Sequence, residues 1–320
     1  SVFGILYNKV IAERQNLPVP STWQDLSLPS YFGLVGAGDP RKSGSMHAMY
    51  EIILQGYGWE AGWKILRRIG RNVRHFSGGA SQIGKEVAVG EIVYGIAIDT
   101  YAGDIIRLVG SDRLGYVLPS DFAAINGDAI GMIRNSPHRE VAEGFIEYLL
   151  SEAGQRLWYA KRGSPGGPVE FELGKLPVIP SLYGVVEPAS VIRQNPFAIA
   201  NLLPYDAGKA GLRWTVVNDL FGAFIIDVHK QLMRAPSVSE ISGIPVSEQE
   251  LAALQQGLEA EIAKAQQQLE AARGQLEQCR RARDAANFRK QAAQDQLRQL
   301  NQRLERSRQS LDRLRPLDPE

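Results

Sequence analysis

The segment with the clearest capacity to bind a ligand runs from Asp39 to Ser45 (DPRKSGS) and leads directly into a helical pattern. Free backbone N–H groups at the start of that helix, the Ser43 and Ser45 hydroxyls and the close approach allowed by Gly44 would together cradle an anion. Arg41 adds positive charge beside them. Taken alone, the segment is better explained by a serine that only caps the helix. A P-loop is excluded, because a second glycine and a Lys-Ser/Thr pair do not follow at the required spacing.

A second candidate is Asp99-Thr100-Tyr101, which follows a strand pattern at residues 91–98. In open α/β sheets, ligands bind beyond the carboxyl ends of the strands. Asp99 would accept hydroxyl groups or hold a cation, and Tyr101 would stack on a ligand or donate a hydrogen bond. The alternative is that Asp99 or Thr100 caps a helix at residues 101–108, and the two interpretations carry equal weight.

A third candidate is Asn126-Gly127-Asp128, which lies directly before a strand predicted at residues 129–133. Asn126 and Asp128 both carry oxygen atoms that accept hydrogen bonds from ligand hydroxyls. Without further context, however, Asn-Gly-Asp is the sequence of a turn. Asn126 and Asp128 are therefore candidate ligand-binding residues only because of their position before the predicted strand.

Side chains for catalysis do not form a recognisable set, so the sequence predicts neither an enzyme nor a resident metal site. The histidines are scattered, without a pair at metal-ligand spacing: His47, His75, His138 and His229. A Gly-x-Ser-x-Gly elbow is absent. The single cysteine, Cys279, excludes an intrachain disulfide framework and a zinc site made of cysteines. It lies on the heptad seam described below, where packing is its expected role.

The elements that must position the candidate residues alternate between strand and helix patterns. The expected strands are residues 2–7, 31–35, 92–98 and 129–133. The expected helices are residues 22–26, 45–55, 59–69, 81–89, 101–108, 137–150 and 212–232. Gly70 is expected to end the helix at 59–69. Such alternation is typical of an α/β layer fold.

The last quarter of the chain differs in amino-acid composition from the rest. Residues 1–245 hold 30 of the 32 glycines, whereas residues 246–315 are rich in Ala, Gln, Glu, Arg and Leu, which favour helix. We expect an α/β region at 1–235, a linker at 236–245 and a helical tail at 246–315. Apolar residues recur every seven positions in the tail, interrupted by Arg283 and Lys290, and this repeat predicts the seam of a coiled coil. One long helix, a loosely paired dimer and two half-length helices folded on each other are all compatible with it.

Charge and hydropathy exclude several classes. The chain has 320 residues with 36 Lys and Arg against 35 Asp and Glu, a formal net charge of +1. That balance gives no basis for nucleic-acid binding. No run reaches the roughly 18 apolar residues of a membrane span. Because the chain begins at Ser1 without a methionine or a basic and apolar leader, we expect that a leader was removed or that the N-terminus is cut.

Several motifs, in this order, resemble the second half of ABC-transporter extracellular solute-binding proteins. They are residues 4–8 (GILYN), 21–26 (STWQDL), 39–45, 90–101 (GEIVYGIAIDTY), 126–128 and 142–155. The branch that they resemble most includes binders of iron(III), organic anions and sugar phosphates. The likeness extends over residues 1–235.

The resemblance implies a periplasmic-binding-protein-like (type II) fold, with two α/β lobes, hinge strands and a ligand cleft. Family members carry roughly a hundred further residues before the segment like 4–8, so a partly incomplete lobe is expected here. The implied cleft residues are Ser43, Gly44, Ser45, Arg41, Asp99, Thr100, Tyr101, Asn126 and Asp128. No cofactor is implied. Iron(III) stays open as a cargo with Tyr101 as its ligand, although Thr100 stands where iron binders carry a second tyrosine.

The resulting hypothesis is a periplasmic or extracytoplasmic solute-binding component of an ABC importer. It would capture a small anionic, phosphorylated or carboxylated solute and deliver it to a permease. The alternative is a sensor or assembly protein, in which a binding fold is tethered through a coiled coil. An enzyme is a third and weaker hypothesis. Pairing of the tail is expected, most simply with a second copy of the chain.

Overall fold

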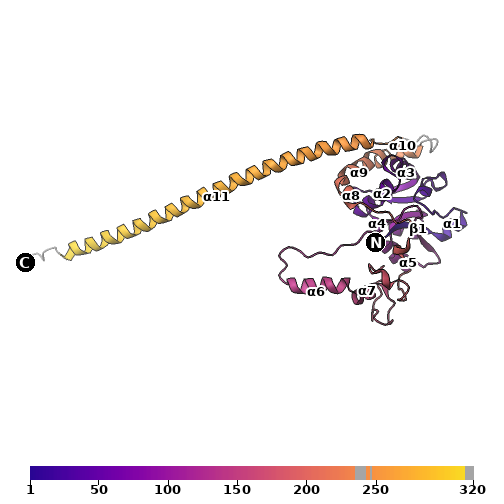
Figure 1. Cartoon of the computed structure of the whole chain (residues 1–320), viewed down its shortest axis with the longest axis horizontal. Helices are drawn as coiled ribbons and strands as arrows, with labels where there is room; N and C mark the ends of the chain where they lie inside the picture. Colours follow the sequence, from indigo (N-terminus) through magenta and orange to yellow (C-terminus); the bar gives the residue numbers. More distant parts are fainter. Residues whose placement is uncertain (235–242, 246, 314–320) are drawn as a thin grey trace, which may run out of the picture. The chain divides into compact units, whose positions relative to one another are not determined.

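The computed structural model describes residues 1–234, 243–245 and 247–313, which divide between two compact units, Ser1–Glu248 and Gln249–Glu320. Most of the expected linker, residues 236–242, and the last two residues of the expected tail lie outside the described residues. The first unit holds the sheet and its helices, and the second consists of a single long helix (Figure 1).

One five-stranded mixed sheet organises the first unit, with the strand order β3-β2-β4-β1-β5. The strands are β1 (Phe3–Asn8), β2 (Val35–Gly38), β3 (Val73–Ser77), β4 (Tyr94–Ile98) and β5 (Leu114–Val117). β2 runs parallel to β3 and β4, whereas β1 is antiparallel to β4 and β5, with Ile5 opposite Ile96 and Val117. This sheet confirms the predicted α/β class.

Most helices near the sheet follow the predicted positions closely. They are α2 (Gly44–Gly56), α3 (Trp59–Asn72), α4 (Ala80–Val89) and α5 (Asp99–Val109), whereas α1 (Lys9–Arg14) was not predicted. Two short 3₁₀ turns, η1 (Gln24–Ser27) and η2 (Pro29–Tyr31), precede β2. The core between these elements is apolar and aromatic, with Leu6, Trp23 and Trp63 fully buried.

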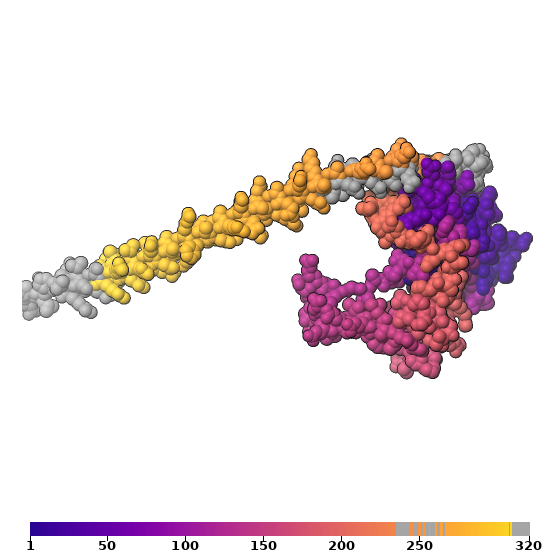
Figure 2. Space-filling view, in the orientation of Figure 1, coloured from indigo at the N-terminus to yellow at the C-terminus, as the bar shows by residue number. Residues whose placement is uncertain are grey.

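After β5 the chain leaves the sheet and later returns to it. Residues 129–200 form the helices α6 (Arg139–Leu150) and α7 (Glu152–Tyr159) and the 3₁₀ turns η3 (Pro180–Leu182) and η4 (Pro196–Ala198), with no strand among them. A small core gathers around Tyr159 and Leu182. Figure 2 shows the magenta segment with α6 projecting from this unit, and α6 has no buried residue. We call residues 129–200 the excursion, and it matches the expected remnant of a second lobe.

Three chain segments lie side by side where the excursion begins and ends. Val2 forms an isolated antiparallel bridge with Ile125, and Ala123 forms a parallel bridge with Leu202. The chain then forms α8 (Ala207–Leu212), α9 (Trp214–Phe221), the π-helical turn η5 (Gly222–Ile226) and α10 (His229–Arg234). The sheet unit is therefore assembled from residues on both sides of the excursion.

Four predictions about elements were wrong. Tyr31 belongs to η2 and the strand starts only at Val35, while residues 129–133 form no strand and have no neighbouring strand to pair with. The single helix expected at 212–232 is interrupted at η5. Gly70 does not end its helix, since α3 continues to Asn72.

The second unit confirms the predicted helical tail. α11 runs without interruption from Glu248 to Arg313, 66 residues, or about 100 Å at 1.5 Å per residue. None of the helices in the described part of the chain combines the length and the apolar character of a membrane span.

Candidate functional site

A cavity of about 600 Å³ lies in the sheet unit, next to the bridged segments at which the excursion begins and ends. Its wall includes the start of α2, the end of β4 and residues from α8 and α9. The lining residues are Ser1, Phe3, Gly44, Ser45, Ala48, Ile98, Ile125, Asn126, Asp128, Leu202, Leu203, Tyr205, Ala207, Ala210, Gly211 and Trp214. Two of the three candidate segments, far apart in sequence, therefore meet in one cavity.

The start of α2 gives the cavity its capacity to hold an anion. Ser43 is the N-cap, and its hydroxyl accepts a hydrogen bond from the Met46 amide at 3.4 Å. The first amides of a helix have no acceptor within the helix, so those of Gly44 and Ser45 are available to a ligand. The first turn contains no acidic residue, which leaves the positive end of the helix dipole uncompensated. Ser43 thus supports the predicted cap, and Ser45 adds a hydroxyl to the cavity wall.

Trp214 forms the facing part of this wall, and the sequence prediction missed it. Its indole stacks on the His47 ring with centroids 3.8 Å apart, and 42% of the residue stays exposed. A Cβ atom added at Gly44 would lie 3.3 Å from the indole, which is shorter than an ordinary van der Waals contact. Gly44 therefore allows the helix start and the indole to approach each other.

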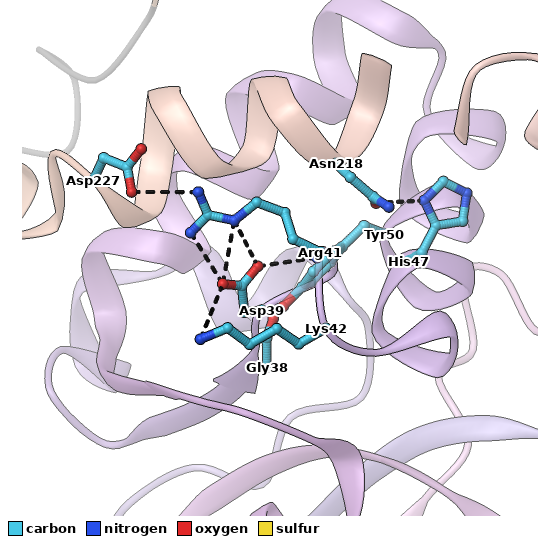
Figure 3. A network of polar contacts seen from close by, with 8 residues as sticks. All are labelled: Gly38, Asp39, Arg41, Lys42, His47, Tyr50, Asn218 and Asp227. Carbon is cyan, nitrogen blue, oxygen red and sulfur yellow. Dashed lines mark hydrogen bonds and ion pairs between the residues drawn. The ribbon is translucent and has the colours of Figure 1, made fainter. Parts of the chain in front are cut away.

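Buried polar pairs hold that wall in place. His47 Nδ1 lies 2.7 Å from Asn218 Oδ1, as Figure 3 shows. Burial lowers the pKa of His47, although the contact with Asn218 opposes this effect. One turn further along α2, Glu51 accepts two hydrogen bonds from Arg213, at 2.8 and 2.6 Å. The segment that carries Trp214 is thus tied to α2 on both sides of the indole.

Asn126 and Asp128 supply the polar groups on the other side of the cavity. The Asn126 amide donates to the Ser1 carbonyl at 2.9 Å, and the Ser1 hydroxyl donates to the Asp128 carboxylate at 2.7 Å. Residues 126–128 form no turn, contrary to the interpretation from the sequence alone, and these contacts hold them beside Ser1. They leave the Asn126 side chain without a described hydrogen-bond partner.

Arg41, a predicted ligand-binding residue, forms ion pairs in this structure. Its Nε and Nη2 atoms donate to Asp39 at 3.0 Å, and Nη1 lies 3.5 Å from Asp227 (Figure 3). Burial acts to raise the pKa of Asp39, but hydrogen bonds from Arg41 outweigh it and lower that pKa. Arg41 does not line the cavity and instead connects the loop before α2 to the end of η5.

The second candidate segment, Asp99-Thr100-Tyr101, also lies outside the cavity lining. Asp99 is buried and accepts a hydrogen bond from the Val2 amide at 3.0 Å, which fixes the segment leading into β1. Burial raises the pKa of its carboxyl group. The Thr100 carbonyl accepts a hydrogen bond from Lys175, and Tyr101 is exposed on α5. Both interpretations of Asp99, helix start and ligand contact, had missed this anchoring role.

A metal ion finds no cluster of ligands in the described part of the chain. No three His, Cys, Asp or Glu side chains there come close enough to hold one. Tyr101, the predicted ligand if iron is the cargo, has no second tyrosine next to it in the sequence.

Comparison with known proteins identifies relatives of this chain. Residues 1–176 match a family model described as bacterial extracellular solute-binding protein. The phosphoglycerate transport regulatory protein PgtC of Salmonella typhimurium is 33% identical over 180 residues, 56% of this chain and 42% of that protein. The chain thus spans about two fifths of the length of the curated relatives it matches.

Two solved structures share the fold at low sequence identity. The periplasmic binding protein AfuA from Actinobacillus pleuropneumoniae, solved with exogenous fructose-6-phosphate bound, has a TM-score of 0.51 at 17% identity over 70% of this chain and 66% of its own. Apo ferric ion-binding protein A from Pasteurella haemolytica has a TM-score of 0.53 at 18% identity over 74% and 68%. The fold is that of a type II periplasmic binding protein, with a partly incomplete second lobe and a long C-terminal helix.

Proposed function

Because the chain belongs to the family of bacterial extracellular solute-binding proteins, we propose that it captures a small phosphorylated or carboxylated solute for an ABC importer. The observation that carries this proposal is the cavity of about 600 Å³ whose wall contains the first residues of α2. A cavity of this size accommodates a small metabolite. The free amides and the helix dipole favour an anionic group at that end.

The two ends of the cavity suit different parts of one ligand. Gly44 and Ser45 would hold the anionic group. At the other end, the Asn126 side-chain amide would donate hydrogen bonds to ligand hydroxyl groups or accept them, and the Asp128 carboxylate would accept them. A second anionic group beside Asp128 is disfavoured by like-charge repulsion. The best-fitting ligand is therefore anionic at one end and hydroxylated at the other. The fructose-6-phosphate named for the AfuA structure has this form.

Trp214 would contact the carbon skeleton between the two ends. Its exposed face is apolar and lies next to the anion position, so it would exclude water from the bound group. Water exclusion strengthens the hydrogen bonds made by the helix start.

A binding measurement on one substitution tests this proposal. Titration calorimetry should detect fructose-6-phosphate or phosphoglycerate binding to the native chain, and Ser45→Asp should weaken it at least tenfold, about 1.4 kcal/mol, by placing a carboxylate at the anion position. Ser81→Asp is the matched control, because Ser81 is likewise the second residue of its helix, α4, but is remote from the cavity lining. Equal affinities of the Ser45→Asp and native proteins would refute the assignment, as would failure of any phosphorylated or carboxylated compound to bind. An iron(III) titration in the same series tests the metal cargo.

A regulatory role is the second candidate function. It is favoured by α11, which solute capture does not require, and by the relative described as a transport regulatory protein. In that case, the protein would signal ligand binding to a partner protein, in addition to delivering the solute to a permease. Both roles place the protein outside the cytoplasm, in keeping with the extracellular family.

A further inference from the structure

The exposed seam of α11 is an interaction surface that the solute site does not use. The heptad positions a and d carry leucines that are between 52% and 60% exposed. The described leucines of this seam are Leu269, Leu276, Leu297, Leu300 and Leu304. A leucine stripe left in water costs roughly 25 cal/mol per Å² of apolar surface, so the stripe favours a partner helix. The question is which kind of helix fits.

Over residues 266–308, basic residues flank this seam and acidic residues do not. Within residues 266–308, the positions e and g next to the seam carry arginines and no acidic residue. These arginines are Arg273, Arg280, Arg289, Arg303 and Arg308. Arg283 and Lys290 occupy position a of the seam itself. In the same stretch the acidic residues fall on the outer positions b and f: Glu270, Glu277, Asp284, Asp295 and Glu305.

The ion pairs within α11 involve cations on both faces of the helix. On the seam side, Arg273 pairs with Glu270 at 2.9 Å and Arg283 with Asp284 at 3.2 Å. On the outer face, Arg281 pairs with Glu277 at 3.0 Å and Arg298 with Asp295 at 3.9 Å. By contrast, Arg280, Arg289 and Arg303 form no ion pair with another described side chain. Lys290, on the seam, has none among the described side chains either. Four of the seam-side cations, Arg280, Arg289, Lys290 and Arg303, are therefore available to carboxylates of an incoming helix.

A second copy of the chain is a poor occupant for this surface. In a parallel pair, Arg283 and Lys290 would each face their own counterpart across the seam, and Arg303 would face Arg308 of the other copy. An antiparallel pair centred on the same region again brings the basic residues of one helix against those of the other. Like charges at these positions disfavour pairing, and opposite charges select the partner.

We propose that α11 pairs with an α-helix of another protein that has apolar residues at its seam and Asp or Glu on its flanks. The acidic flanks would face Arg280, Arg289 and Arg303. Carboxylates at the centre of the seam would meet Arg283 and Lys290. This helix is the occupant that satisfies both the leucine stripe and the unpaired cations.

Peptide binding to the full chain tests the charge of the partner. The probes are three synthetic helices of about six heptads with leucine at a and d, differing only in Glu, Gln or Lys at e and g. Fluorescence anisotropy should show the Glu peptide bound at least about tenfold tighter than the Lys peptide, with the Gln peptide between them. Added salt should weaken binding of the Glu peptide most, because it screens the flanking charges.

Two triple variants separate the seam from net charge. Arg280→Glu with Arg289→Glu and Arg303→Glu should reverse the preference toward the Lys peptide. Arg281→Glu with Arg298→Glu and Arg306→Glu changes net charge equally on the outer face and should keep it. Circular dichroism confirms that both variants retain the helix. The proposal is overturned if the outer variant acts like the seam variant, or if the three peptides bind alike.

Sedimentation of the full chain alone provides the remaining test. We expect a monomer at micromolar concentration without peptide. If the native chain dimerises as tightly as it binds the Glu peptide, the second copy is the occupant and the acidic partner is rejected.

Discussion

Polar side chains, rather than apolar ones, hold the cavity wall at its base. His47 and Glu51 lie one turn apart on α2, both fully buried, and each meets a partner from the chain that returns after the excursion. Those partners, Asn218 and Arg213, flank the segment that starts with Trp214. A buried polar pair in low dielectric is strong when complete and costly when broken. The orientation of the indole therefore depends on groups that no ligand touches.

Breaking the buried ion pair should destabilise the sheet unit strongly. Glu51→Ala leaves the Arg213 guanidinium, which is 2% exposed, without its carboxylate, and should cost about 3–5 kcal/mol in urea unfolding. Replacing both partners, by Glu51→Leu with Arg213→Met, should restore most of that stability, because no buried charge is left. A double variant as unstable as the single one would contradict this account.

Stability should fall as the solution becomes mildly acidic. Burial holds the pKa values of His47 and His229 below the ordinary value of 6.5, so the folded protein resists protonation. Below about pH 6.5 the unfolded chain binds more protons than the folded one. The free energy of unfolding should then drop by up to about 1.4 kcal/mol per pH unit for each histidine.

Urea unfolding between about pH 7 and pH 5.5 measures this slope. His47→Gln should reduce it, whereas His138→Gln, at an exposed position, should leave it as in the native chain. An unchanged slope in the His47 variant would refute the assignment.

At the scale of elements, close packing rather than propensity accounts for several glycines inside helices and strands. Gly70 lies within α3 and packs closely against η5, since a Cβ atom there would lie 2.4 Å from Ile225. A Cβ atom at Gly36 of β2 would lie 2.1 Å from Ile92, and one at Gly38 would lie 2.5 Å from Met46. Glycine permits these contacts, although it is a poor strand and helix former.

Gly70→Ala should therefore destabilise the protein despite the better helix propensity of alanine. The clash with Ile225 should cost about 1–3 kcal/mol in the free energy of unfolding. Gly84→Ala in α4 is the matched control, because its Cβ would meet Ile105 at an ordinary 3.5 Å. That change should be neutral or stabilising by up to about 1 kcal/mol. Equal effects at the two glycines would show that close packing against Ile225 does not explain the glycine at position 70.

The sequence predicted the class of fold, most helices near the sheet and the tail, because their periodicity is local. In the helix predicted at 212–232, the apolar residues at helical spacing are Leu212, Val216, Leu220 and Phe224, each one residue before the stripe that is buried. Leu212 is 71% exposed, and the buried stripe is Arg213, Val217, Phe221 and Ile225. An arginine signals a surface position until its partner Glu51 is known, and that partner is 162 residues away.

The same limit applies to the cavity. Gly44 and Ser45 could be found from the local signal of a helix start, and Asn126 and Asp128 from the Asn-Gly-Asp sequence. Trp214 could not, because only its packing on His47 in the folded chain places it at the cavity. Arg41 gave the same local signal as an anion ligand, although its first carboxylate partner, Asp39, lies only two residues before it. Its second partner, Asp227, is distant in sequence and is found only from the structure.

At the scale of the whole molecule, the two units should unfold independently. The apolar core lies within residues 1–248, so a chain that ends at Glu248 should keep the thermal transition of the sheet unit within about 4 °C. Far-ultraviolet circular dichroism should at the same time lose the contribution of α11. A larger drop in the melting temperature would show that the sheet unit depends on the tail.

The backbone pairing of Ala123 with Leu202 has a consequence for how this chain could be rebuilt. The Leu203 amide donates to the Ala123 carbonyl at 2.7 Å, so the chain enters and leaves residues 129–200 at one point. Every strand of the sheet lies outside that stretch. The stretch is thus an insert with adjoining ends, which a turn-length peptide could replace at small entropic cost. An exchange at this single junction would leave every strand and every cavity-lining residue in the chain.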